Sequence, residues 1–400
     1  MLYKHLGSRL IHSGEAAFTK RMSKAVSQPK NMPLYLSSVY SFDDVDALEA
    51  AYEDSNAGYI YARMANPNAD ALCEVLAAAE REDTAALVCA SGMAAIVLTI
   101  ISQMQSGDHI IATPVLYGGV YDYLKNELPR FGITVDFVDP IAQDLKAFFK
   151  PNTKLLYTET ITNPLMEVFD LRALAQIAHE HDAKLAVDNT FATAAICKPL
   201  QLGADFSLYS ATKYLCGHSD LTAGAILASP DLIEGLKRHN ALYGAMLSAF
   251  DAWLLTRSLR TLHLRIKKHS QNAAALAEFF SGQTRLIEKV HYPGLITSPH
   301  HDTAKAQFSE GLYGGMLSID FAGGMAAADR FTALCEGIKL VPSLAGVATS
   351  ISYPKRTSHR AYSDAELAKT GIAKGQLRIS AGLEEAEDLI AEFERVLKKL

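Results

Sequence analysis

Short apolar segments alternate with helical patterns between residues 85 and 210 of this chain. Six such segments lie at 85–89, 109–112, 134–138, 154–158, 184–187 and 205–209. Helical patterns separate several of them, notably over 171–181. Strands that alternate with helices form mainly parallel sheets with helices on both faces, because parallel neighbours require a crossover connection. We therefore expect an α/β fold for this part of the chain.

Polar side chains follow the ends of five of these segments. They are Ser91, Tyr117, Asn163, Asp188 and Lys213. In an open α/β sheet, ligands bind in the crevice beyond the carboxyl ends of the strands. The sequence therefore predicts that these five side chains share one ligand-binding site.

Lys213 lies in the motif 210–214 (SATKY), directly after an apolar segment. A lysine amine held away from water loses proton affinity and becomes a usable nucleophile or base. The hydroxyls of Ser210 and Thr212 suit a phosphate group. Together these features suggest a Schiff base between Lys213 and pyridoxal phosphate (PLP). The alternative is a lysine at a strand end whose amine extends to water.

Two further motifs agree with a pyridine cofactor that carries a phosphate. Residues 91–95 (SGMAA) open a helix after the first segment, and the free N–H groups of such a helix start bind anions. Asp188 ends an apolar strand, where an unpaired carboxylate is costly. Paired with a protonated pyridine nitrogen, this carboxylate would keep the ring electron-withdrawing. Otherwise it caps a turn or a helix.

A long helical pattern over about 249–280 leads into a smaller α+β domain. That domain has predicted strands at 316–321 and 376–380, a helix near 325–336 and a closing helix that ends at Leu400. We predict an N-terminal arm at 1–60, a large α/β domain at 61–250 and a C-terminal domain at 251–400. The arm is irregular but too apolar for a disordered tail, so we expect it to pack against a second subunit.

Two arginines lie in positions that call for an anionic partner. Arg378 interrupts the apolar strand 376–380, where a substrate carboxylate gripped by the guanidinium would serve. A structural salt bridge is the alternative. Tyr61 and Arg63 point the same way if their segment is extended, and together they suit an anion. The alternative there is a surface arginine beside a packed tyrosine.

Composition excludes several classes of function. The net charge of −6 gives no reason to expect a nucleic-acid or membrane partner, and no apolar run reaches the length of a membrane span. Five scattered cysteines form neither a metal pattern nor a disulfide framework, which favours a cytoplasmic location. A dinucleotide-binding enzyme would share the strand pattern, but no G-x-G-x-x-G motif follows the first strand.

In combination, the motifs resemble the Cys/Met-metabolism family of PLP enzymes over nearly the whole chain. The matching segments are 61–63 with 66–67, 91–93, 116–119, 162–164, 187–190, 210–214 with 217–218, and 377–380 with 382–383. The resemblance implies the fold type I architecture of PLP-dependent transferases, with PLP as cofactor and an amino acid as substrate. It also implies a homotetramer made of two dimers, with active sites shared across each dimer.

The resemblance implies catalytic roles for three residues. Lys213 would bind the cofactor covalently and move protons, Tyr117 would stack on its ring, and Asp188 would pair with its nitrogen. The resemblance also assigns binding contacts: the phosphate to Gly92, Met93, Ser210 and Thr212, the phosphate of a neighbouring subunit to Tyr61 and Arg63, the ring hydroxyl to Asn163, and the substrate α-carboxylate to Ser343 and Arg378. No metal is expected.

Local motifs favour one reaction within the family. Residues 217–224 look most like methionine γ-lyases, so we expect cleavage of the Cγ–S bond of methionine-like amino acids to 2-oxobutanoate, ammonia and a thiol. Gly119 matches cystathionine enzymes better, because methionine γ-lyases often carry a cysteine there. The alternatives are γ-replacement by a cystathionine γ-synthase or O-acetylhomoserine sulfhydrylase, a cystathionine lyase, and a PLP-fold protein that only binds. Lys355 and Arg356 add positive charge near the expected entrance, which favours an acidic γ-substrate.

Overall fold

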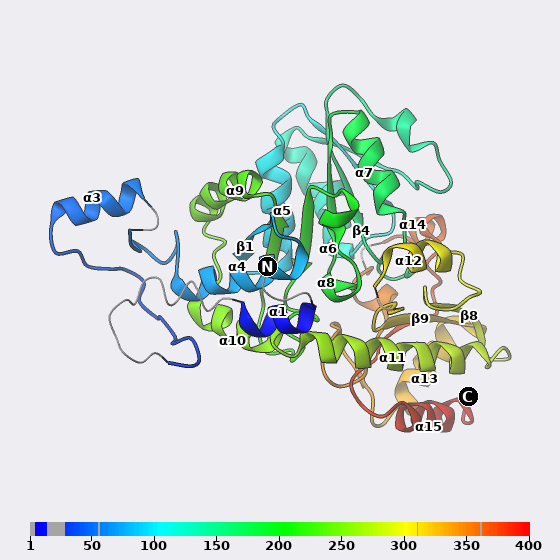
Figure 1. The fold of residues 1–400 in the computed structure, drawn as a ribbon. Coiled ribbons are helices and arrows are strands. Elements are labelled where there is room, and N and C mark those ends of the chain that lie inside the picture. The colour runs from blue at the N-terminus through cyan, green and yellow to red at the C-terminus, as the bar shows by residue number, and fades with distance from the viewer. Residues whose placement is uncertain (1–4, 14–28, 55–56, 310, 361) are drawn as a thin grey trace.

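The chain forms a larger and a smaller lobe, and the segment that carries α3 (Val45–Glu53) projects from the body (Figure 1). The structure is a computed structural model that describes residues 5–13, 29–54, 57–309, 311–360 and 362–400. The larger lobe contains a seven-stranded sheet and the smaller lobe a five-stranded sheet. The predicted α/β fold with a smaller C-terminal α+β part is confirmed.

The sheet of the larger lobe is mainly parallel, as the alternation of strands and helices predicts. Its spatial order is β1-β7-β6-β5-β4-β2-β3, and β7 is antiparallel to both of its neighbours. The strands are β1 (Ala85–Cys89), β2 (His109–Ala112), β3 (Thr134–Phe137), β4 (Thr153–Glu159), β5 (Lys184–Asp188), β6 (Phe206–Ser210) and β7 (Gly224–Ala228). The sequence pattern predicts the first six and misses β7.

Helices bury both faces of this sheet. On strand β4, Leu156 packs into the core on one face, whereas Leu155 and Tyr157 pack into the core on the other. The first core is covered by α4 (Pro67–Glu80) and α7 (Leu171–Glu180), and the second by α5 (Gly92–Gln103) and α9 (Pro230–Tyr243). Burial on both faces explains why the strands are continuous apolar runs and not alternating ones.

Shorter helices complete the larger lobe. α6 (Gly118–Asp122) continues as a π-helical turn and a 3₁₀ turn that ends at Phe131, where the sequence predicts one helix. α8 (Thr193–Ile196) follows β5. The predicted long helix over 249–280 is two helices, α10 (Ala249–Leu259) and α11 (Leu262–Ser281), of which α11 runs along the smaller lobe in Figure 1.

The smaller lobe has the strand order β10-β11-β12-β9-β8. Its strands are β8 (Ile287–His291), β9 (Met316–Phe321), β10 (Lys339–Leu340), β11 (Ser350–Ser352) and β12 (Gln376–Ser380). Its helices are α12 (His301–Gln307), α13 (Gly324–Leu334), α14 (Asp364–Thr370) and α15 (Ala386–Leu397). β9 and β12 are antiparallel neighbours, so Arg378 lies inside a sheet and not at its rim.

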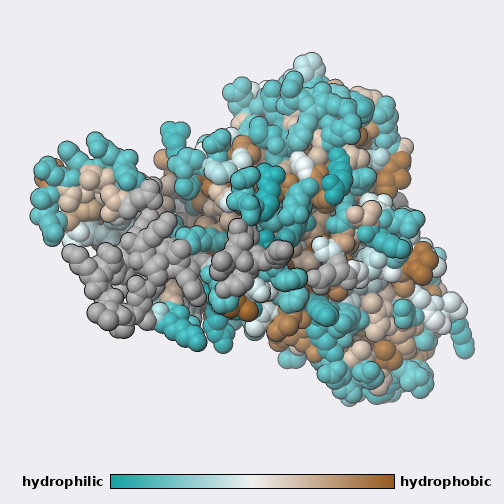
Figure 2. Space-filling model, in the orientation of Figure 1, coloured by the Kyte–Doolittle hydropathy of each residue, from teal (hydrophilic) through white to brown (hydrophobic). Residues whose placement is uncertain are grey.

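The N-terminal region divides into a packed part and a projecting part. In α1 (Leu6–His12), Leu10 is fully buried in the core of its own chain. The segment with α3 (Val45–Glu53) stands away from the body in Figures 1 and 2, and Leu36, Val39 and Tyr52 are largely exposed on it. Contact of this segment with a second subunit stays a prediction. Residues 1–4, 14–28 and 55–56 of the predicted arm lie outside the described residues.

The surface in Figure 2 is mostly hydrophilic, with hydrophobic side chains scattered between polar ones. In the parts of the chain that the structure describes, no helix is long and apolar enough to cross a membrane. Across those same residues, no three His, Cys, Asp or Glu side chains gather in a way that could hold a metal ion.

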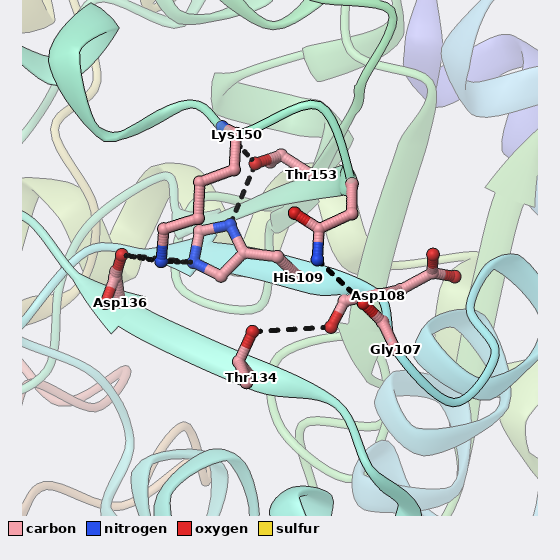
Figure 3. A network of polar contacts seen from close by, with 8 residues as sticks. Gly107, Asp108, His109, Thr134, Asp136, Lys150 and Thr153 are labelled. Carbon is pink, nitrogen blue, oxygen red and sulfur yellow. Dashed lines mark hydrogen bonds and ion pairs between the residues drawn. The ribbon is translucent and has the colours of Figure 1, made fainter.

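A polar network joins β2, β3 and β4 at their amino ends (Figure 3). The imidazole of His109 is fully buried, with Nδ1 2.8 Å from Thr153 Oγ1 and Nε2 3.1 Å from Asp136 Oδ2. Lys150 Nζ donates to the same Asp136 oxygen at 2.7 Å. Burial, and then the positive charge of Lys150, lowers the pKa of His109. The network is therefore stable with a neutral imidazole, at the edge of the sheet opposite the polar strand ends.

Acid is expected to destabilise the fold through its buried histidines. Burial lowers the pKa of His109, and it lowers the pKa of His269 and of His359 to about 4. The unfolded chain binds protons on these histidines more tightly than the folded chain does. The stability that the neutral histidines contribute is therefore complete above about pH 6.5, and it is lost as the pH falls towards their pKa values in the folded chain. Each group contributes at most about 1.4 kcal/mol per pH unit over that interval.

Unfolding midpoints measured from pH 8 to pH 4 test this expectation, at fixed protein and cofactor concentrations. His269→Asn is the matched variant. His269 lies 2.6 Å from the carbonyl oxygen of Ala381 through Nδ1, and asparagine keeps a donor there without a titrating group. The variant should show a flatter acid limb than the parent chain. An acid limb equally steep in His269→Asn and in the parent would contradict the expectation. The parent midpoint alone does not test it, because burial raises the pKa of Glu80 to about 7 and this carboxyl group stabilises the fold as the pH falls.

Candidate active site

A cavity of about 260 Å³ lies beyond the carboxyl ends of the large sheet, where the smaller lobe meets it. Its wall includes all five polar residues that follow strand ends in the sequence. Ten of the twelve predicted site residues line it: Gly92, Met93, Tyr117, Asn163, Asp188, Ser210, Thr212, Lys213, Ser343 and Arg378. The cavity therefore brings together residues from both lobes, while the role of each remains a prediction.

Lys213 directs its amine across this cavity to the smaller lobe. Its backbone N–H closes a turn onto the carbonyl of Ser210, the last residue of β6. Its Nζ donates a 2.8 Å hydrogen bond to Ser343 Oγ. Burial, and then the positive charge of Arg378, lowers the pKa of Lys213 to about 8. Near neutral pH, this amine is therefore deprotonated far more often than a solvated lysine.

Arg378 carries a buried charge with few partners. The residue is 4% exposed, and its Nη1 donates to Asn163 Oδ1. Its Nε has no hydrogen-bond partner, and none of the ion pairs among the described residues includes it. A buried guanidinium without a carboxylate is costly, so the arrangement suits a ligand that brings one. The structural salt bridge considered as the alternative is absent from the described part of the chain.

Two buried carboxyl groups lie side by side at the end of the sheet. Glu159 on β4 and Asp188 on β5 are paired in register, and both line the cavity. Asp188 Oδ1 accepts a 2.9 Å hydrogen bond from the N–H of Thr190. Burial raises the pKa of Asp188, and burial together with the charge of Asp188 raises the pKa of Glu159 well above its usual range. A cationic ligand group bound in the cavity beside these two carboxyl groups would be stabilised.

The start of α5 is suited to binding an anion. Ser91 caps this helix, and its Oγ accepts a 3.1 Å hydrogen bond from the N–H of Ala94. A Cβ at Gly92 would lie 2.6 Å from the Cβ of Ser210, so glycine lets the helix start approach the end of β6. Gly92, Met93, Ser210 and Thr212 thus line the same cavity, and the hydroxyl of Thr212 is hydrogen-bonded to the backbone of Ala223.

Nearly the whole chain matches a known protein family. Residues 10–398 fit the family described as Cys/Met metabolism PLP-dependent enzyme. The chain belongs to this family. Its enzymes depend on PLP, so the cofactor predicted from Lys213 and its neighbours is confirmed.

Individual relatives are similar over almost their full length. The L-methionine gamma-lyase of Fusobacterium nucleatum subsp. polymorphum is 37% identical over 99% of this chain and 98% of that protein. The O-succinylhomoserine sulfhydrylase of Pseudomonas aeruginosa is also 37% identical, over 92% of this chain and 90% of that protein. The crystal structure of metB from Corynebacterium glutamicum has a TM-score of 0.90 and 33% identity, covering 99% of this chain and 98% of that one. Two relatives named for different reactions thus have the same 37% identity to this chain.

The residues of the cavity fit PLP at each of its functional groups. The α5 start with Ser210 and Thr212 would hold the phosphate, and Asp188 would face the ring nitrogen. Lys213 supplies the amine with a lowered pKa that covalent attachment requires. The side-chain oxygen of Asn163 accepts a hydrogen bond from Arg378, and the amide NH₂ of Asn163 could meet the ring hydroxyl.

Tyr61 and Arg63 are the two predicted site residues that do not line the cavity of their own chain. The side chain of Tyr61 is 43% exposed. Arg63 extends over the Tyr61 ring and donates to the carbonyl of Ala241, next to the projecting segment. Their placement leaves both side chains on the outside of the chain, which is where contact with another subunit would have to occur.

Several cavity residues were given no role from the sequence. Glu159 ends β4 and accepts two backbone hydrogen bonds, and Thr190 Oγ1 accepts the N–H of Ser210 at 2.7 Å. Phe191 lies 6.0 Å from the Arg378 guanidinium, and Ser358 comes from the loop after β11. The extended strand 153–159 was the one available clue, since a glutamate at the end of a buried strand resembles Asp188 at the end of β5.

The positive charges expected at the entrance are engaged elsewhere. Arg356 forms an ion pair with Asp329 and lies over the ring of Tyr353. Lys355 Nζ donates to the carbonyl of Tyr362. Neither side chain lines the cavity, so the structure removes the support for recognition of an acidic γ-substrate by these two residues.

A second and larger cavity, of about 400 Å³, lies between β8, the loop 292–300 and residues 165–167. None of the predicted site residues lines it. It lacks the buried lysine, the helix start and the unpaired guanidinium of the smaller cavity. Size alone is therefore a poor guide to the reactive site in this chain.

Proposed function

We propose that this enzyme cleaves the Cγ–S bond of methionine-like amino acids by γ-elimination and releases 2-oxobutanoate, ammonia and a thiol. The observation that carries the proposal is the position of Lys213 Nζ. It lies in the cavity lined by the residues expected to hold PLP, and it donates a hydrogen bond to Ser343, which is expected to bind the substrate. The choice of γ-elimination is supported by similarity to L-methionine gamma-lyases, which are 36–38% identical over at least 92% of the chain.

In this proposal the residues of the cavity divide the work of binding and proton transfer. Arg378 and Ser343 hold the α-carboxylate, which places the α hydrogen beside Lys213 Nζ. Lys213 takes that proton as a general base and then moves a β proton. Tyr117, 43% exposed at the cavity mouth, protonates the leaving thiolate. PLP, when bound, supplies the electron sink that Asp188 strengthens.

The proposal includes a homotetramer of two dimers. Tyr61 and Arg63 would then reach the phosphate bound in a neighbouring chain, and the projecting segment with α3 would pack on that neighbour. Support comes from the exposed apolar side chains of this segment and from the absence of both residues from their own cavity.

A γ-replacement reaction on an activated homoserine is the second candidate. The observation in its favour is the 37% identity to an O-succinylhomoserine sulfhydrylase, equal to that of the first lyase. Both reactions use the same buried lysine and carboxylate-binding arginine, so the two are separated by what leaves and what enters at the γ carbon.

Product analysis tests the proposal. The purified holoenzyme is offered L-methionine, L-cystathionine and O-acetyl- or O-succinyl-L-homoserine separately, with and without a thiol. We expect rapid release of 2-oxobutanoate from L-methionine that added thiol does not suppress. Thioether formed from an acylated homoserine alone, without turnover of L-methionine, would replace the lyase with the synthase.

A further inference from the structure

Glu159 is the least explained group in the cavity. It is 5% exposed, and burial next to Asp188 raises its pKa. The proposed steps of binding and proton transfer do not use it. A buried carboxyl group that takes no part in a reaction is normally a liability, because its desolvation must be offset by hydrogen bonds.

One oxygen of Glu159 holds the turn that carries Tyr117. Oε1 accepts a 2.7 Å hydrogen bond from the backbone N–H of Tyr117, the residue directly before α6. This N–H would otherwise have no partner at a helix start. On the other side of the same turn, a Cβ at Gly118 would meet the carbonyl oxygen of Ser358, so the turn has little freedom to shift. The backbone position of Tyr117 is thus fixed by a carboxylate 42 residues away in sequence.

The other oxygen holds the residue that contacts Arg378. Glu159 Oε2 accepts a 3.0 Å hydrogen bond from the backbone N–H of Asn163. The side chain of Asn163 in turn accepts from Arg378 Nη1. Next in the chain, the carbonyl of Pro164 accepts a 2.8 Å hydrogen bond from Ser318 Oγ on β9, the strand beside β12. Glu159 therefore connects the large sheet to the sheet that carries the carboxylate-binding arginine.

We infer that Glu159 is a positioning residue, whose two carboxylate oxygens hold the backbone amides of Tyr117 and Asn163 and thereby aim the Tyr117 ring and the Arg378 guanidinium at the substrate. The inference rests on the proposed roles of Tyr117 and Arg378. It explains why a glutamate lies where the loops after β2 and β4 converge. The two oxygens of Glu159 thereby set the distance between the side chain of Tyr117, which protonates the leaving atom, and that of Arg378, which binds the α-carboxylate.

This role depends on the carboxyl group of Glu159. Both of its oxygens accept, which an amide side chain cannot match, since one end of glutamine is a donor. In Glu159→Gln, an NH₂ group would face the N–H of either Tyr117 or Asn163, and that N–H would lose its partner. In Glu159→Asp, a shorter side chain would reach one of the two amides.

Amide hydrogen exchange of the folded protein, read by mass spectrometry at single-residue resolution, gives the first test. In the parent chain the amides of Tyr117 and Asn163 should exchange as slowly as strand amides. Glu159→Gln should accelerate exchange at one or both, and Glu159→Asp at one, each by at least about tenfold. Glu80→Gln is the control, because Glu80 is a fully buried carboxyl group that accepts a hydrogen bond from Tyr209 and does not line the cavity. It should leave both amides unchanged.

Kinetics give the second test. With the substrate that the product analysis identifies, Glu159→Gln should lower kcat/KM by about 10²-fold and raise KM. Asn163→Ala should raise KM as well, and the two changes should be less than additive, because both act on Arg378. Additive effects, or a Glu159→Gln enzyme with parental KM, would overturn the inference.

Exchange separates this inference from the proposed reaction, since it requires no turnover. Fast exchange at Tyr117 and Asn163 in the parent chain overturns the positioning role whatever the reaction. Slow exchange at both amides in the parent chain, with faster exchange at one of them in Glu159→Asp, supports the positioning role. This result holds even if Glu159→Gln fails to fold or L-methionine is not the substrate.

Discussion

Lys213→Ala is expected to lower turnover by roughly 10⁴-fold or more and to abolish covalent attachment of PLP. The same amine is proposed to bind the cofactor and to move the α and β protons. No second lysine lines the cavity in the described residues, so nothing can replace it. The protein should lose its yellow colour. Hydride reduction of the parent enzyme should leave the cofactor mass on the peptide with Lys213, and no modified peptide should appear in the variant.

Lys198→Ala is the matched control for this experiment. Burial also lowers the pKa of Lys198, yet this residue lies beside α8 and away from the cavity. Its loss should leave colour, attachment and turnover close to those of the parent. A yellow, reducible and active Lys213→Ala enzyme would exclude Lys213 as the attachment site and, with it, the proposed mechanism.

The parallel part of the sheet is predictable because each strand is buried on both faces. Under that condition a strand is a short continuous apolar run, and the polar residue after it marks its carboxyl end. β7 has the same kind of sequence, yet it runs antiparallel between β1 and β6. Strand direction depends on the connection from β6, where the chain turns back without a crossover helix, and this is not encoded in the strand itself.

The break between α10 and α11 has a similar explanation. The helical pattern continues through 260–261, so the sequence predicts one helix. In the fold, Arg265 donates to the carbonyls of Tyr214, Leu215 and Ser258, which ties α11 to the turn after Lys213 and to the end of α10. Contacts between residues far apart in sequence decide where this helix begins.

The site is predictable in so far as chemistry is local. Lys213 between two hydroxyl residues and Asp188 at the end of an apolar strand are each recognisable from a few neighbouring residues, so the sequence alone identifies them. Glu159 is not recognisable in this way, because its carboxylate acts on amides 42 and 4 residues away that meet only in the fold. The lack of an ion pair at Arg378 is equally a property of the folded chain.

Arg378→Met is expected to abolish most activity without a loss of stability. The guanidinium is buried with one hydrogen-bond acceptor, and its burial lowers the pKa of Arg378 to about 10. An apolar side chain of similar length removes that desolvation cost, while Asn163 Oδ1 loses one donor. The free energy of unfolding should stay level or rise by about 1 kcal/mol. Loss of the bidentate carboxylate contact should lower kcat/KM roughly 10²- to 10³-fold, mainly through KM.

Arg265→Met is the contrasting variant, because Arg265 is buried to a similar degree, at 5% exposed, but donates to three carbonyls and to Thr261 Oγ1. Its loss removes the guanidinium donor from the carbonyls of Tyr214 and Leu215 and should lower the thermal midpoint clearly, which the loss of Arg378 should not. Thermal midpoints at fixed protein and cofactor concentrations, together with KM for the amino-acid substrate, make the comparison. If Arg378→Met were as destabilising as Arg265→Met, Arg378 would be part of the framework of β12. If the Arg378 guanidinium serves to bind a ligand carboxylate, Arg378→Met should be stable and should bind the substrate poorly.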